Sequence, residues 1–154
     1  MKKKVKVLVV LILVLVCSTS CKLNKTPKDL QTFSEIMEAE GFSLLDATDQ
    51  FEEGSVESVT LAVNEKYQIE FFVMQDEASA VRAFAQNKYE FELYEKATGR
   101  ASYTSVTMGN HGSYKLTAGG DFYVVSRIEN TFLYIVTEVE NKDDVNNILK
   151  KLGY

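Results

Sequence analysis

The chain has 154 residues, of which 45% are hydrophobic and 25% are charged, and it contains one proline. This composition is typical of a single globular domain and excludes disordered, collagen-like and disulfide-dense chains. The 17 basic and 22 acidic residues give a formal net charge of −5. Nucleic acid is therefore not an expected partner, because binding it requires a surface that neutralises phosphates.

The charge is unevenly distributed along the chain. Residues 1–21 hold four lysines and no acid, whereas the rest holds 13 basic against 22 acidic residues, a net of −9. The lysines precede an uninterrupted apolar run at 7–17, which is the pattern of a secretory signal. As a helix this run spans about 16 Å, roughly half of a bilayer's hydrocarbon core. We therefore expect export rather than an ordinary transmembrane helix.

The residues after the apolar run are Ser18, Thr19, Ser20 and Cys21. They resemble the lipobox of bacterial lipoproteins, in which a small residue precedes a cysteine that becomes the lipidated N-terminus. Ser20 matches the small residue and Cys21 the lipid attachment site, while Ser18 departs from the aliphatic residue usual at its position. The resemblance covers about 22 residues and says nothing about the domain beyond.

This resemblance implies a signal peptide over 1–20 and a lipidated cysteine with a short tether over 21–26. It also implies contact with the membrane through the lipid anchor, on the extracytoplasmic face of the cell membrane. Ordinary cleavage near Ser20 and an uncleaved short anchor are the alternatives. Both cysteines, Cys17 and Cys21, precede the domain, so the domain has no disulfide, cysteine nucleophile or cysteine-ligated zinc. Cys17 is the poorer acceptor because bulky Val16 precedes it.

Helical spacing predicts a first helix that starts at Pro27, with Thr26 as its N-cap, and ends at Gly41. Residues 56–63 and 67–74 form a predicted hairpin, followed by a helix that Asp76 caps and that ends before residue 99. Further strands are predicted at 102–108, 113–117, 121–128 and 132–139, with a turn at 109–112. A last helix covers 141–152.

These elements predict one α+β domain over residues 27–154, in which an antiparallel sheet of about five to seven strands packs with three helices. Segments 56–96 and 121–152 have the same hairpin-helix order and align at an offset of 65 residues. This suggests a pseudo-repeat, although convergence of a common layout explains the pattern equally well.

Two residues of the predicted turn, Asn110 and His111, are the candidate ligand contacts. Ser113 could share a side with His111, but no motif supplies the orienting acid or the oxyanion hole that serine-histidine catalysis needs. The sequence also lacks GxSxG, HExxH and SxxK motifs, and its acidic residues at 46–53 lack the spacing of a calcium loop. No catalytic residue, cofactor or metal is therefore predicted.

Adjacent aromatic residues at 71–72 and 122–123 must point to opposite faces of a strand. If helices leave one face uncovered, an aromatic patch would be exposed there. The export signal, the short tether and the strand-rich domain together predict a membrane-anchored binding or interaction module for a protein or small-molecule ligand of the cell envelope. The alternatives are an accessory structural subunit of an envelope complex and, less favoured, a cell-envelope hydrolase.

Overall fold

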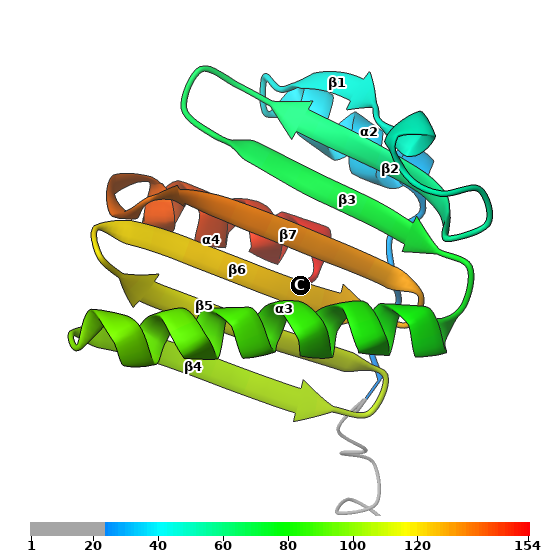
Figure 1. Cartoon of the computed structure of the whole chain (residues 1–154). Coiled ribbons are helices and arrows are strands. Elements are labelled where there is room, and N and C mark those ends of the chain that lie inside the picture. The colour runs from blue at the N-terminus through cyan, green and yellow to red at the C-terminus, as the bar shows by residue number, and fades with distance from the viewer. Residues whose placement is uncertain (1–23) are drawn as a thin grey trace, which may run out of the picture.

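The computed structural model describes residues 24–154, which form one seven-stranded antiparallel sheet and three α-helices (Figure 1). The strand order is β1-β2-β3-β7-β6-β5-β4, so β1 and β4 are the two edges. The helices are α2 (Leu30–Ala39), α3 (Glu77–Thr98) and α4 (Lys142–Leu152), and the single-turn helices are η1 (Thr48–Gln50) and η2 (Val139–Asn141). The strands are β1 (Ser43–Asp46), β2 (Val56–Val63), β3 (Gln68–Met74), β4 (Ala101–Met108), β5 (His111–Ala118), β6 (Asp121–Ile128) and β7 (Thr131–Glu138). The α+β prediction is confirmed.

Helices cover both faces of the sheet. Because side chains alternate along a strand, β3 sends Phe71 to the face of α2 and α4 and Phe72 to the face of α3. Figure 1 shows α3 in front of the sheet and the other two helices behind it. The ring of Phe33 on α2 stacks on Phe71, with centroids 4.3 Å apart. The paired aromatics therefore fill two separate cores rather than forming one exposed patch.

The two helical layers are offset from each other. Helix α3 packs against β5, β6 and β7, whereas the core beneath α2 and α4 is built from β2, β3, β6 and β7 and includes no residue of β4 or β5. On the side of α4, the faces of β4 and β5 are therefore left without a helical cover. All eight residues of β4 are exposed.

The structure corrects the predicted start of the first helix. Its N-cap is Asp29 rather than Thr26, and its side chain accepts a hydrogen bond from the Thr32 N–H at 2.7 Å. Pro27 lies before the helix. A carboxylate at the N-cap satisfies a free N–H and also interacts favourably with the helix dipole. The predicted cap at Asp76 is confirmed, with a bond of 2.7 Å from the Ser79 N–H.

The predicted turn at 109–112 is too long. Strands β4 and β5 pair as far as Met108 with His111, so only Gly109 and Asn110 form the turn and His111 begins a strand. Gly112 lies within this strand and packs closely under α3, since a Cβ there would lie 3.1 Å from the ring of Phe84. Strand β1 was not predicted at all; it forms by pairing with β2.

Candidate functional site

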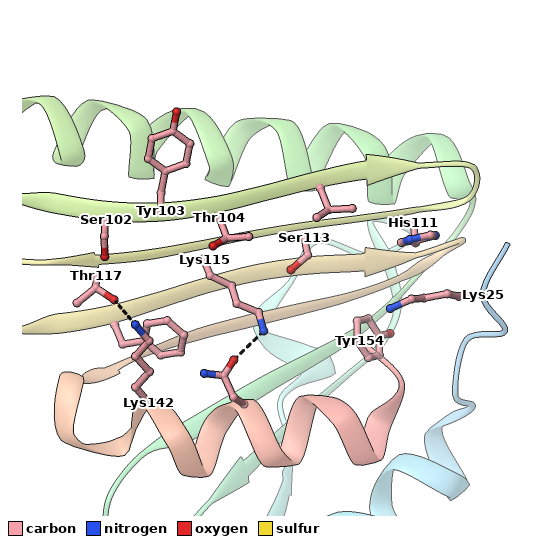
Figure 2. A pocket seen from close by; sticks show the side chains of 13 residues that line it. Lys25, Ser102, Tyr103, Thr104, His111, Ser113, Lys115, Thr117, Lys142 and Tyr154 are labelled. Atoms are coloured by element: carbon pink, nitrogen blue, oxygen red, sulfur yellow. Dashed lines mark hydrogen bonds between the residues drawn. The ribbon is translucent and has the colours of Figure 1, made fainter. Parts of the chain in front are cut away.

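An open groove of about 470 Å³ lies where α4 leaves the sheet uncovered. Strands β4 and β5 form its floor, α4 forms one wall, and the segment before α2 closes one end (Figure 2). The lining residues are Lys25, Ser102, Tyr103, Thr104, Val106, His111, Ser113, Lys115, Thr117, Phe122, Lys142, Asn146 and Tyr154. None of them is acidic.

The polar floor follows from strand alternation. On β5, residues 112, 114, 116 and 118 are buried beneath α3, so His111, Ser113, Lys115 and Thr117 point into the groove. The β4 residues paired with them add Ser102, Thr104 and Val106 on the same face. Tyr103 faces the other way (Figure 2) and stacks on Tyr114, with centroids 5.7 Å apart. The groove therefore offers hydroxyl groups rather than an aromatic platform.

Three partly buried lysines enter the groove from three different segments. Lys115 extends from β5 and donates to Asn146 Oδ1 on α4 at 2.7 Å. Lys142, also on α4, donates to Thr117 Oγ1 at 3.2 Å. Lys25 donates through Nζ to the Gly153 carbonyl at 2.9 Å. Each ammonium group thus has a neutral acceptor and is held in place.

The charges of these lysines are not balanced by nearby acids. Within residues 24–154, no carboxylate lies within 4.0 Å of the Nζ atoms of Lys25, Lys115 or Lys142. Burial lowers the pKa of Lys115, and the positive charges of Lys25, Lys150 and Lys142 lower it further. Residues 24–154 hold 12 basic and 22 acidic residues, a net of −10. The groove is thus a positive region on an acidic domain.

His111 lies at the end of the groove that Lys25 closes. Its Nδ1 atom is buried and has no hydrogen-bond partner among residues 24–154. Burial lowers the pKa of His111, and the charges of Lys25 and Arg127 add to this effect, so the imidazole is neutral near pH 7. Ser113 shares its face, as expected, but no acid in the groove lining orients the ring as catalysis would require.

Asn110, the other candidate ligand contact, holds the N-terminal segment. Its Oδ1 accepts from the Lys25 N–H at 2.9 Å, and its Nδ2 donates to the Lys25 carbonyl at 2.7 Å and to Glu129 Oε1 at 2.9 Å. These bonds place Lys25 beside His111. Asn110 does not itself line the groove, and its described contacts give it a positioning role.

Cys21, the candidate lipid attachment site, lies outside the described residues. Within residues 24–154, no group of three or more histidine, cysteine, aspartate or glutamate side chains is arranged to hold a metal ion. In the acidic segment 46–53, Asp46 accepts hydrogen bonds from both the N–H and the hydroxyl of Thr48. Its carboxylate therefore stabilises a local turn.

A smaller hollow of about 360 Å³ lies on the opposite face of the sheet, beside α3. Its aromatic lining comprises Phe51, Phe72, Phe132 and Tyr134. Phe72 and Phe132 are buried, and Phe51 is 40% exposed and packs edge-on against Phe72. Phe51, from the loop before β2, thus packs over the aromatic residues of this face, and Phe72 and Phe132 form no exposed patch.

Sequence reasoning found His111 but missed the three lysines. The alternation of His111, Ser113, Lys115 and Thr117 on one strand face is a signal in the sequence that could have identified Lys115. Nothing local indicates that Lys25 and Lys142 join it, because they lie 90 residues before and 27 residues after Lys115 in the chain.

No family model matches this chain, and no curated protein matches it. Among solved structures, the chain is similar to a GTP binding regulator from Thermotoga maritima, with a TM-score of 0.43 and 16% sequence identity. The match covers 81% of this chain and 87% of the other. None of the helices formed by residues 24–154 combines the length and apolar character needed to cross a membrane.

Proposed function

We propose that this chain is an exported lipoprotein, anchored through Cys21 at the extracytoplasmic face of the cell membrane, that acts as a binding module. The observation that carries the binding role is the groove on the uncovered face of β4 and β5. It is open and carries hydroxyl and ammonium groups, and its lysines are held in position. The support for export is the group of four lysines followed by the apolar run at 7–17, which ends four positions before Cys21.

The groove favours binding over hydrolysis. A hydrolase of the serine-histidine type needs an acid to orient the histidine, and glycoside hydrolysis needs two facing carboxylates. The groove lining supplies His111 and Ser113 but no carboxylate. Burial and the charges of Lys25 and Arg127 also disfavour protonated His111, which a general base must become during turnover.

An accessory role in an envelope complex is the second candidate, and the edge strand β4 favours it. This strand has eight residues, all exposed, with no charged residue and no proline. Unpaired edge strands of this kind are templates for pairing with another chain, and natural proteins usually protect them with charges or prolines. A partner strand added to β4 would extend the sheet at the groove's outer margin.

The hairpin-helix pseudo-repeat is a further part of the proposal. Units β2-β3-α3 and β6-β7-α4 have the same element order, and their inner strands β3 and β7 are neighbours in the sheet. The two helices lie on opposite faces, and α3 crosses onto strands of the other unit. The two units therefore share the order of their elements along the chain but not the placement of their helices on the sheet.

The anchor is tested by replacing Cys21 with alanine and expressing the full chain in a bacterial host. The variant should accumulate as unprocessed precursor or leave the detergent-rich phase after detergent partitioning. Without Cys21 no acyl chain can be attached, and stable anchoring of the mature chain requires attached acyl chains. Cys17→Ala is the matched control and should partition as the unaltered chain does. A Cys21→Ala chain that keeps its normal mature size and stays in the detergent phase contradicts the proposed lipidation.

A further inference from the structure

We infer that the groove binds an extended ligand that carries at least two phosphate groups. This inference rests on the proposed function, because it takes the groove to be the ligand site of the binding module. Its basis is the set of three lysine ammonium groups that lie along one polar strand face without a carboxylate partner.

The first step is the sign of the ligand. A partly buried charge is unfavourable unless an opposite charge or several hydrogen bonds compensate it. Lys115 has one neutral acceptor, Asn146, and the positive charges of Lys25, Lys150 and Lys142 act on it. An anion in the groove would relieve this repulsion and would accept hydrogen bonds from ammonium protons that now have no protein acceptor. On a domain of net negative charge, the groove brings cations together in a lining without a carboxylate, and this favours an anion there.

The second step is the chemistry of the anion. The donors in the groove are lysine ammonium groups and the hydroxyls of Ser102, Thr104, Ser113 and Thr117. No arginine lines it, and arginine is the residue whose planar fork matches a carboxylate with two parallel bonds. Lysines and hydroxyls act as single donors that can approach from several directions, which suits the three or four oxygens of a phosphate group.

The third step is the length of the ligand. Lys25 lies beside His111 at one end of the groove, and Lys142 bonds to Thr117 at the other. Residues 111 and 117 are six positions apart on an antiparallel strand, a distance of about 20 Å at about 3.4 Å per residue. Lys115 lies between them (Figure 2). One phosphate group cannot reach both ends, so a ligand that uses all three lysines must carry phosphates along a chain.

The groove does not favour nucleic acid as that chain. Bases bind single-strand sites by stacking on exposed aromatic rings. Here the ring of Tyr103 turns away from the groove, and Phe122 is 1% exposed beneath Lys142. The site therefore recognises phosphates and the polar backbone between them. Those phosphates belong either to a soluble oligophosphate or to lipid headgroups near the anchor.

Binding is measured by isothermal titration of the full chain in neutral detergent with sodium tripolyphosphate, at low and at physiological salt. Affinity should weaken as salt rises. Lys115→Gln and Lys142→Gln should each weaken binding about tenfold, which corresponds to the loss of one charged contact. Lys66→Gln is the matched control, since Lys66 is 62% exposed, pairs with Asp144 and lies outside the groove. It should change the affinity less than about twofold, as expected for an exposed charge.

The remaining arms identify the source and length of the phosphate ligand. Orthophosphate should bind at least about tenfold more weakly than tripolyphosphate, because tripolyphosphate can contact different lysines with separate phosphate groups and orthophosphate has only one. Vesicles of phosphatidylglycerol, compared with phosphatidylcholine, report headgroup binding, and loss of that binding in Lys115→Gln assigns it to the groove. Circular dichroism confirms that each variant is folded. If Lys115→Gln is not, Lys142→Gln replaces it in the tripolyphosphate titration and Lys25→Gln replaces it in the vesicle assay.

Three results overturn the inference. The first is the absence of binding to both tripolyphosphate and anionic vesicles at low salt. The second is equal affinity of the groove variants and Lys66→Gln, and the third is tighter binding of polyglutamate than of tripolyphosphate. Any of these leaves the anchor test at Cys21 unaffected. Failure of that anchor test, conversely, leaves tripolyphosphate binding by the groove intact.

Discussion

Replacing Asn110 with alanine should release the N-terminal segment from the domain without unfolding the sheet. The Asn110 side chain makes two hydrogen bonds to the backbone of Lys25, of 2.9 Å and 2.7 Å. The contacts that hold the turn itself use the Asn110 carbonyl, which accepts from Arg127 Nη1 at 3.0 Å and from the Glu129 N–H at 2.8 Å. Alanine keeps this carbonyl, so the turn should survive the substitution.

The size of the effect follows from the two lost bonds to Lys25. The third lost bond, from Asn110 Nδ2 to Glu129 Oε1, does not hold the N-terminal segment. An intramolecular hydrogen bond contributes about 1 kcal/mol net, so the clamp on Lys25 is worth about 2 kcal/mol. At 25 °C this makes release of the Lys25 segment from the domain about 30-fold more favourable. The exchange rate of the Lys25 amide hydrogen should rise by the same factor. Amides of β6 and β7, which pair along their full lengths, should exchange as in the unaltered chain.

Hydrogen exchange followed by NMR gives the rate at each amide. Asn130→Ala is the matched control, because Asn130 lies in the neighbouring β6–β7 turn and its Nδ2 donates to the Met74 carbonyl rather than to Lys25. It should leave the Lys25 rate unchanged. An unchanged Lys25 rate in Asn110→Ala would refute the clamp, and a general rise across β6 and β7 would show that Asn110 supports the whole fold instead.

Two further predictions concern the domain itself. Phe33→Ala should lower the free energy of unfolding by about 4 kcal/mol, since Phe33 is fully buried against Phe71. Phe51→Ala should lower it by only about 1 kcal/mol, because the Phe51 ring is 40% exposed. Urea denaturation measures both values, and equal losses would mean that α2 is not docked on the sheet. Because the pKa of His111 is lower in the folded chain than its ordinary value of 6.5, the unfolded chain binds the proton more readily, and stability should fall as pH drops through about 6.5. His111→Gln should remove this component, so parallel stability–pH curves for the two chains would contradict it.

The sequence was most informative where structure is local. Strand alternation and helical spacing located every helix and all strands but β1, because each depends on periodicity within one segment. Strand β1 has four residues and exists by pairing with β2, so no local pattern distinguishes it from a loop. The start of α2 was misplaced because Thr26-Pro27 and Asp29 are both plausible capping signals, and the packing of Phe33 and Met37 decides between them.

The groove could not be predicted in the same way. It exists because α3 and α4 cover different strands of one sheet, and this offset depends on contacts between segments far apart in the chain. The polar alternation on β5 marks a face that no helix buries, yet the same alternation would fit an ordinary solvent-exposed strand. Lys25 and Lys142 distinguish the groove from an ordinary exposed strand, and only the folded chain brings them to this face.

The clamp at Asn110 also relates the groove to the proposed anchor. Lys25 is four positions after Cys21 in the chain, a span of at most about 14 Å when fully extended. Under the proposed lipidation, the end of the groove that holds Lys25 and His111 therefore lies close to the membrane, and the Lys142 end lies about 20 Å farther along the strand. A lipid headgroup could reach the first end, whereas a soluble chain of phosphates could occupy the full length. The vesicle and tripolyphosphate arms should consequently respond differently to Lys142→Gln, which would weaken tripolyphosphate binding and leave headgroup binding at the Lys25 end intact.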